Sequence, residues 1–279
     1  MSDWQVFSLS RLRFRLLILL ACCMVSVIFS GCSTQTMSAN ASASRSEIVT
    51  DSDETPERKR ARIRVELALG YFEQGKTNIA LDEIKQAIAA DPNFSDSYSL
   101  RGLVYMRLND FGFAEDSFKK ALSIKPKDAN ILHNLGWLKC QQGQFSQAVQ
   151  IFSDALSDPL YGGRAKTLMA QGLCQAKAGM DREAEASLIK AYEFDAANPV
   201  TGYNLASLLL KRGDFVRAQF YIRRLNNSEF ANAESLWLGV KIENRLGNAE
   251  ARQQLGAQLE KRFSQSHQAE LYRSAAFND

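Results

Sequence analysis

The chain has 279 residues, with 34 basic and 31 acidic side chains and a formal net charge of +3 at pH 7. This near-neutral balance gives no electrostatic reason to expect a nucleic-acid partner. Only two histidines are present, His133 and His267, and neither has a second His, Cys or carboxylate at metal-ligand spacing. We therefore expect no metal and no cofactor.

The amino-terminal residues 1–31 have the pattern of a secretory signal. Arg11, Arg13 and Arg15 precede an apolar run at residues 16–29, interrupted only by Ser26, and small residues follow it. The apolar run is shorter than the ~20 residues that a membrane-spanning helix needs. An ordinary signal peptide or an uncleaved anchor stays open as an alternative to a lipoprotein signal.

The end of this signal resembles a bacterial lipobox. The segment Ile-Phe-Ser-Gly-Cys at 28–32 ends in Cys32, with Phe29 at a place that usually holds Leu. The resemblance implies that Cys32 is diacylated and becomes the first residue of the mature chain. Because Ser33 and not Asp follows Cys32, the sorting rules for such lipoproteins imply an outer-membrane protein that faces the periplasm.

Residues 32–57 are expected to form the lipidated cysteine and a disordered tether. The stretch is rich in Ser, Thr, Asn and Ala and has no hydrophobic periodicity. For a flexible chain of this length the root-mean-square reach is roughly 25–30 Å. The folded part can therefore stand clear of the lipid surface, with the membrane contacted through the anchor.

In the middle of the chain similar residues recur every 34 positions, which is the period of the tetratricopeptide helix–turn–helix repeat. Small residues recur where the first helix of each repeat packs on the second. We place them at Ala68, Gly102, Gly136, Gly172, Ala206 and Gly239 in the first helices. The partners twelve residues later are Ala80, Ala114, Ala148, Ala184, Ala218 and Ala251.

The turns and the core residues follow the same register. Gly75, Gly143, Gly179 and Gly213, with Asn109 in the second repeat, fall between helices where a left-handed backbone is needed. The remaining packing positions are apolar, and they are Leu67, Leu135, Leu205, Leu238, Ile84, Phe118, Phe152, Leu188, Ile222 and Leu255. The prediction is an all-α right-handed superhelix of six repeats at residues 58–263, followed by a carboxyl-terminal cap or tail at 264–279.

One stretch imitates a nucleotide-binding motif. Residues 70–77 match G-x-x-x-x-G-K-[ST], which in a phosphate-binding loop follows a strand. Here Gly70 lies within the first helix of repeat one and Gly75 is its turn, so no nucleotide is expected. Neither G-x-S-x-G nor Cys-x-x-Cys occurs, and the chain is predicted not to be an enzyme.

Cys140 and Cys174 remain once Cys22, Cys23 and Cys32 are assigned to the signal and anchor. They fall near the ends of first helices in stacked neighbouring repeats. Two buried thiols in a helix interface are one interpretation. A disulfide is the other, because the periplasm is oxidising, although neighbouring helix axes lie near the distance limit for a bridge.

Several segments resemble the tetratricopeptide lipoproteins of type IV pilus biogenesis, the pilotins of the PilF/PilW family. They are Asn-Leu-Gly-Trp-Leu-Lys-Cys at 134–140, Asp-Pro-Leu-Tyr at 158–161 and Ser-Leu-Trp-Leu-Gly at 235–239. The resemblance implies a scaffold that binds the secretin, the outer-membrane pore of the pilus, and promotes its localisation and multimerisation. Residues 263–266 lack a proline that relatives often carry. An adaptor for cell-wall or other envelope enzymes, or an unrecognised enzyme, are the alternatives.

The concave face of the superhelix is the predicted partner-binding groove. In such repeats it is lined by positions 2, 5, 9 and 12 of the first helix. These positions are mostly apolar here, and exposed apolar patches usually mark binding sites. Phe72 and Trp137 are the expected hot spots. The predicted groove residues are Val65, Leu69, Phe72, Leu103, Met106, His133, Trp137, Cys140, Met169, Leu173, Tyr203, Leu210, Leu236 and Val240.

Overall fold

The computed structural model describes residues 53–277, and within this range the regular structure consists of thirteen helices without a strand. The predicted signal sequence, Cys32 and nearly all of the predicted tether lie outside the described residues. No helix in the described range is both long and apolar enough to cross a lipid bilayer.

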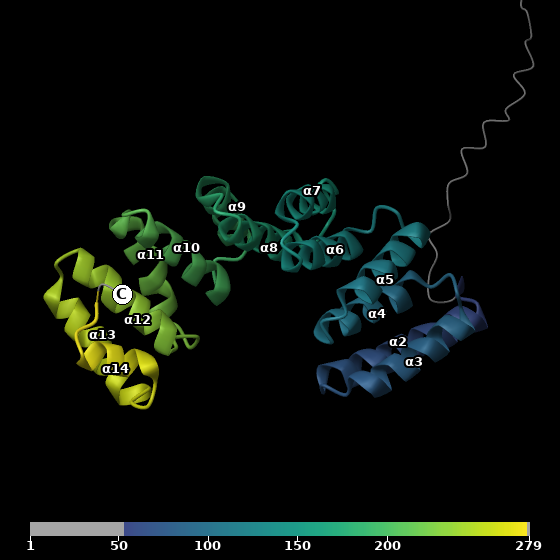
Figure 1. The fold of residues 1–279 in the computed structure, drawn as a ribbon, viewed down its shortest axis with the longest axis horizontal. Helices are drawn as coiled ribbons and strands as arrows, with labels where there is room; N and C mark the ends of the chain where they lie inside the picture. The colour runs from purple at the N-terminus through teal and green to yellow at the C-terminus, as the bar shows by residue number, and fades with distance from the viewer. Residues whose placement is uncertain (1–52, 278–279) are drawn as a thin grey trace, which may run out of the picture. The chain divides into compact units, whose positions relative to one another are not determined.

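Twelve of these helices form six consecutive hairpins (Figure 1). The hairpins are α2 (Pro56–Glu73) with α3 (Thr77–Ala90), α4 (Ser95–Arg107) with α5 (Phe111–Ile124), α6 (Ala129–Gln141) with α7 (Phe145–Leu156), α8 (Arg164–Lys177) with α9 (Asp181–Phe194), α10 (Pro199–Lys211) with α11 (Phe215–Asn226), and α12 (Ala233–Arg245) with α13 (Ala249–Arg262). A short helix, α14 (His267–Arg273), follows them. The chain is thus an all-α solenoid, as predicted.

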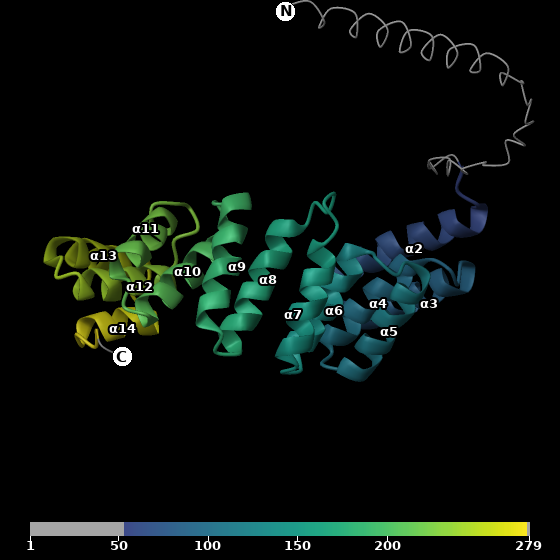
Figure 2. The same cartoon turned by 90° about the horizontal axis from the view of Figure 1, so that it is seen from above.

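The pattern of helix contacts defines an inner and an outer side of the stack. Each first helix touches the first helix of the next hairpin, from α2 with α4 through to α10 with α12. In the described part of the chain no comparable contact joins one second helix to the next. The first helices therefore line the inner, concave side, and the second helices lie outside (Figures 1 and 2).

The turns between paired helices adopt the predicted left-handed conformation. Gly75, Gly143, Gly179 and Gly213 have φ between 74° and 80°, and Asn109 has φ 59°. Gly247 supplies the same conformation in the sixth hairpin, with φ 71°. A side chain with a Cβ is strained in this region, which explains the choice of glycine and asparagine.

The small residues of the first helices are required by close packing. A Cβ on Gly102 would lie 2.5 Å from the Phe118 ring, and one on Gly136 would lie 2.8 Å from the Phe152 ring. Phe118 and Phe152 are fully buried, which confirms their predicted packing role. The ring of each second helix thus occupies the space that a larger side chain on the first helix would need.

Three predicted packing positions at the ends of the array differ from the rest, and one of them, Leu255 in the last hairpin, is only partly buried. Leu67 is 42% exposed, so its assignment to the core is wrong. Its helix, α2, opens the stack, and in the described chain no repeat precedes it to cover that face. Ala251 in the last hairpin is only partly buried, whereas the five equivalent alanines are fully buried.

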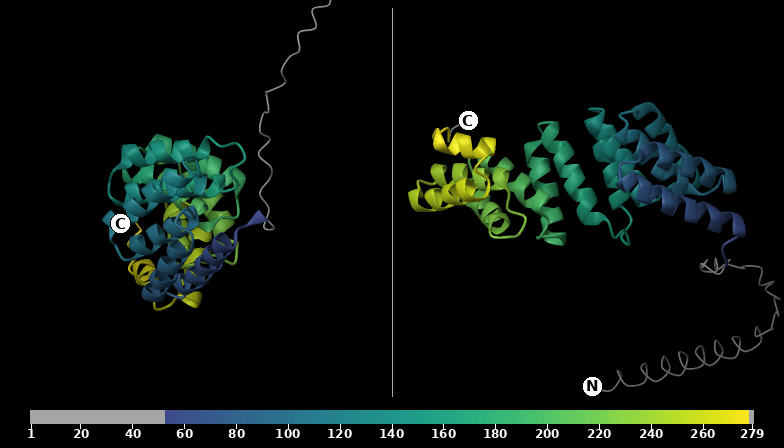
Figure 3. Two further views of the ribbon diagram at one scale, coloured as in Figure 1. Left: turned by 90° about the vertical axis from the view of Figure 1, so that its right-hand side faces the viewer. Right: turned by 90° about the horizontal axis from the view of Figure 1, so that it is seen from below.

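The carboxyl-terminal helix α14 closes the other end of the stack. It packs on both α12 and α13, in the place that the first helix of a seventh repeat would take (Figure 3). Tyr272 lies so close to Gly256 that a Cβ there would stand 1.9 Å from its ring. The packed segment within residues 264–277 is therefore a cap on the last repeat.

Candidate functional site: the concave groove

The first helices place most of the predicted apolar positions on the concave face with part of each side chain accessible. Leu69 is 42% exposed, and the others are partly buried. The partly accessible predicted groove residues are Val65, Leu69, Phe72, Leu103, Met106, Trp137, Met169, Leu173, Tyr203 and Leu210. These side chains come from α2, α4, α6, α8 and α10, so the apolar strip follows five successive repeats.

His133 does not belong to this accessible surface, and its assignment to the groove is wrong. Its side chain is buried, with 6% of the residue exposed, and its Nδ1 lies 2.9 Å from Thr167 Oγ1 on α8. The Tyr161 hydroxyl lies 3.0 Å from the same Thr167 oxygen. Tyr161 comes from the longer loop at 158–163 and is itself buried, so this loop packs onto the threonine that His133 contacts.

Burial, and to a smaller extent the positive charge of the nearby Lys166, lower the pKa of His133 to about 4. In the unfolded chain the imidazole has its ordinary pKa of about 6.5. Between these values the unfolded state binds the proton more readily. The contribution of the neutral imidazole to stability is therefore complete above pH 6.5 and is lost as the pH falls towards 4.

We expect the free energy of unfolding to fall by about 3 kcal/mol between pH 6.5 and 4 because of this one group. Urea denaturation at several pH values in this range measures the slope of the free energy of unfolding against pH. His133→Gln should flatten it, whereas His267→Gln should not, because the His267 side chain is 72% exposed. An unchanged slope in His133→Gln would contradict the assignment.

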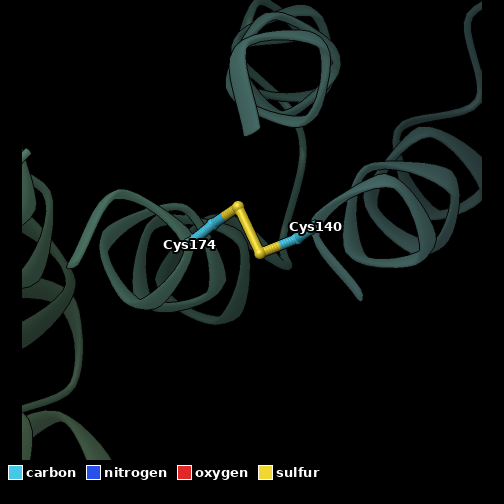
Figure 4. The surroundings of a disulfide bond; sticks show 2 residues. All are labelled: Cys140 and Cys174. Atoms are coloured by element: carbon cyan, nitrogen blue, oxygen red, sulfur yellow. A yellow bond between two sulfur atoms is a disulfide. The ribbon is translucent and has the colours of Figure 1, made fainter. Parts of the chain in front are cut away.

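Cys140 and Cys174 form a disulfide that joins α6 to α8, with their Cα atoms 5.7 Å apart (Figure 4). Cys140 is 2% exposed and Cys174 is fully buried. Cys140 therefore contributes a buried cross-link to the wall between repeats three and four, and it offers no contact surface in the groove.

Reducing this disulfide is expected to lower the free energy of unfolding by about 2–4 kcal/mol, because the cross-link restricts the unfolded chain. Urea denaturation with and without reductant measures the difference, and the Cys140→Ala, Cys174→Ala double variant should be insensitive to reductant. Intact mass after alkylation under denaturing, non-reducing conditions provides the check. Two alkylated thiols in protein secreted to the periplasm would mean that the bridge is absent.

Leu236 and Val240 are fully buried, so they too are wrongly assigned to the groove. They pack in one core cluster with Leu259 and with Ala269 of α14. The cap covers them. On α12 the side chain of Lys241 is partly accessible, whereas Trp237 is only 6% exposed and packs in the same buried cluster.

The rings of Phe72 and Trp137, the predicted hot spots, each contact a cationic side chain of the following repeat. The Arg107 guanidinium lies 3.7 Å from the centre of the Phe72 ring, and Lys177 Nζ lies 5.5 Å from the Trp137 ring. Arg107 also donates a hydrogen bond to the Phe72 carbonyl. These contacts fix the rings while leaving part of each accessible, which suits a preorganised contact surface.

The carboxyl-terminal end of the groove holds two adjoining hollows of about 380 and 360 Å³. Tyr203 and Leu210 line the first hollow, as the groove positions predict. The other lining residues were not among the predicted groove positions, because some lie at other positions of α10 and α12 and others come from the cap. The missed side chains include Ser207, Lys211, Glu234, Trp237, Leu238, Lys241, Arg245, Gln268 and Phe277.

Arginines on the first hairpin and on the outer helix α11 form ion pairs. Arg62 bonds to Glu54 at 3.0 Å and to Glu66 at 3.0 Å. Arg223 pairs at 2.9 Å with Glu243, which is only 1% exposed. Removing Arg223 would leave a buried carboxylate without its ion pair, so this arginine has a structural role.

The segment that imitates a nucleotide-binding loop is helical. Gly70 lies inside α2, and Gly75 forms the left-handed turn before α3. Its backbone amides are used in the helix and the turn, as the Lys76 amide bonded to the Tyr71 carbonyl at 2.9 Å shows. The residues are therefore not arranged to wrap a phosphate.

Comparison with known proteins places this architecture among pilus biogenesis factors. The tetratricopeptide repeat family matches residues 65–129 and 117–150. The type IV pilus assembly protein PilF of Pseudomonas aeruginosa is 25% identical over 198 residues, which cover 71% of this chain and 79% of PilF. A solved structure of P. aeruginosa PilF superposes with a TM-score of 0.71 at 23% identity, covering 79% of this chain and all of that one.

The crystal structure of PilW, described as a widely conserved type IV pilus biogenesis factor, is 31% identical. It superposes with a TM-score of 0.69 and covers 75% of this chain and 96% of PilW. The similarity therefore extends over nearly the whole of that solved chain, and not over a few repeats alone.

Proposed function

The chain belongs to the family of PilW, the type IV pilus biogenesis factor, and on this premise we propose that it is an outer-membrane lipoprotein that binds the pilus secretin. In this role it would promote localisation of the secretin to the outer membrane and its multimerisation. A non-enzymatic scaffold needs an anchor and a contact surface, and the two are proposed for different parts of the chain.

The partly accessible apolar strip along the concave groove is the observation that supports the contact surface. Side chains such as Leu69, Leu103 and Leu173 remain incompletely covered although the fully buried residues around them complete the core. Leaving apolar surface in water has a cost that a binding partner can remove. An amphipathic helix or extended segment of the secretin would dock here through hydrophobic anchors.

The proposed anchor is a diacyl group on Cys32, followed by the tether. A lipid chain contributes ~0.8 kcal/mol per buried CH₂, so two chains give stable membrane attachment. The tether would let the repeat array reach a secretin subunit while the anchor stays in the outer membrane. Lipidation at Cys32 is supported by its lipobox resemblance.

Cys32→Ala is the experiment that tests this proposal. We expect the variant to lack the lipid mass, to leave the outer-membrane fraction and to support few secretin multimers, as judged by gels that preserve the multimer. Ser33→Asp is the matched control: it should keep the lipid but retain the protein at the inner membrane. An unlipidated wild type, or Cys32→Ala protein that stays membrane-bound, would contradict the anchor.

A further inference from the structure

We infer that the edge of the stack formed by the loops between consecutive hairpins rests on the phospholipid surface that holds the anchor. The contact is made by four exposed apolar side chains at the last three of these loops, and we call them the apolar edge: Leu160, Phe194, Val200 and Phe230. The inference rests on the proposed function in one respect, the lipid anchor ahead of α2, and it adds a second membrane contact made by the folded array.

The side chains of the apolar edge lie largely in water and close to one another. Their exposed fractions are 90% for Leu160, 60% for Phe194, 49% for Phe230 and 45% for Val200. Arg164 joins the first two, because its guanidinium carbon lies 6.0 Å from the centre of the Phe194 ring. The same side chain donates a 2.9 Å hydrogen bond to the carbonyl of Asp158, two residues before Leu160. The first two loops of the apolar edge are therefore neighbours in space.

The third loop adjoins the second through a shared hollow of about 230 Å³. Phe230 lines this hollow together with Ala197 and Pro199, which belong to the loop after Phe194 and to the start of α10. Val200 follows Pro199 directly. The apolar edge thus runs without a break across repeats three to six, and contiguous exposed apolar surface usually marks a contact site.

The loop that carries Leu160 is held by its own hydrogen bonds. The Leu160 amide donates to Asp158 Oδ1 at 2.9 Å, and the Tyr161 amide donates to the Asp158 carbonyl at 3.3 Å. The Tyr161 side chain is buried, so the loop turns this ring inward and leaves Leu160 outside. In the first loop of the same edge Phe94 is covered instead, with 7% exposed and the Arg58 guanidinium 5.1 Å from its ring centre. The exposure of Leu160 is therefore built into its loop, which suits a preorganised contact.

The place where the chain enters the array selects the membrane as the partner of this edge. Every first helix begins at the loop edge, and Figure 2 shows the start of α2 and the loop before α8 along the same upper edge. The proposed tether, residues 32–57, joins the lipid anchor to the start of α2. Exposure alone would not single out this edge, because Leu108, at a hairpin turn on the opposite edge, is 45% exposed. The anchored bilayer lies on the side from which the tether comes.

A tethered surface needs little affinity of its own to stay in contact with lipid. The proposed tether reaches roughly 25–30 Å, which lets the array either stand clear of the bilayer or touch it. A short flexible linker gives an effective concentration of about millimolar, so a weak apolar contact is enough to favour the touching state. Leucine and phenylalanine side chains that enter the boundary between headgroups and acyl chains supply such a contact.

Charge does not drive this contact. Within residues 157–166, 193–200 and 224–232 the acidic residues are Asp158, Glu193, Asp195 and Glu229, and the basic ones are Arg164, Lys166 and Arg224. Without an excess of positive charge the edge has no preference for anionic lipid. A zwitterionic phospholipid surface therefore fits, and the contact should be insensitive to salt.

Photo-cross-linking to lipid tests the inference on the full-length chain in isolated membranes. A photoreactive amino acid is placed at Phe230 or, as the matched control, at Leu108, which are 49% and 45% exposed. Mass spectrometry measures the phospholipid adduct. We expect about tenfold more adduct from position 230 than from position 108, at low and at high salt alike.

A second pair of variants asks whether the apolar side chains make the contact. Leu160→Ser with Phe194→Ser should lower the phospholipid adduct from position 230 by about tenfold. Phe113→Ser with Phe220→Ser changes two side chains that are 59% and 60% exposed on outer helices, and it should leave the adduct within about twofold. Circular dichroism checks that both double variants fold.

Equal phospholipid adducts from positions 230 and 108, or an adduct with a protein in place of lipid from position 230, would overturn the inference. The intact mass of the same protein reports the lipid on Cys32 and separates the inference from the proposed function. A lipidated chain without a phospholipid adduct from position 230 leaves the anchor in place and refutes the inference. An unlipidated chain refutes the anchor, and the ratio of adducts from the two positions still decides the inference.

Discussion

Replacing Trp137 and Phe72 together by alanine is expected to weaken secretin binding by about 2–4 kcal/mol, with helix content unchanged. The two rings lie on the concave face and are partly accessible, with Lys177 and Arg107 over them. Aromatic side chains in such positions dominate interface energies, because each brings a large rigid contact area at little entropic cost. Titration calorimetry with the periplasmic region of the secretin measures the loss.

The matched control for this pair lies on the outer side of the stack. Phe113 and Phe220 belong to second helices and are 59% and 60% exposed. Their double replacement by alanine should leave secretin binding within about 0.5 kcal/mol of wild type, as for a surface change away from the interface. If Trp137→Ala with Phe72→Ala folds normally and still assembles multimers at the wild-type level, the groove is not the working surface.

Replacing Phe152 by alanine is expected to lower the free energy of unfolding by about 3–5 kcal/mol. The ring is fully buried, fits against Gly136, and lies 5.9 Å from the His133 ring, centre to centre. Its removal would open a cavity at the middle of the stack, where repeats three and four share their core. Urea denaturation measures the loss, and Phe220→Ala serves as an exposed control.

Since a repeat protein unfolds through coupled neighbours, the Phe152→Ala measurement needs two probes. Far-ultraviolet circular dichroism reports all helices, whereas tryptophan fluorescence reports the surroundings of Trp137 and Trp237. A loss below about 1 kcal/mol by both probes would show that the site collapses around the change or that the packing described here is wrong.

Much of the fold could be predicted because each repeat needs the same few side chains. Gly102 and Gly136 are small because a second-helix ring lies where a Cβ would be, and Asn109 adopts the left-handed turn that glycine supplies elsewhere. These constraints are local and recur with the period. The prediction was wrong at Leu67, because burial there depends on a neighbouring repeat, and within the described residues 53–277 no repeat precedes the first hairpin.

The groove was predicted less completely because accessibility is a tertiary property. His133 occupies a groove position, yet it is buried against Thr167 of α8 and the Phe152 ring of α7. Leu236 and Val240 also have the right spacing, but α14 covers them. Gln268 and Phe277, which help to line the hollows at the carboxyl-terminal end of the groove, come from the cap and have no counterpart in the repeat pattern.

Site-specific photo-cross-linking tests the central claim, that the concave groove binds the secretin, most directly. A photoreactive amino acid is placed at Leu69 on α2 or at Ile79 on α3, two side chains of the same hairpin that are 42% and 44% exposed. If the concave groove binds the secretin, we expect a secretin adduct in cells from position 69 and none from position 79. Equal adducts from both positions, or an adduct from position 79 alone, would contradict it.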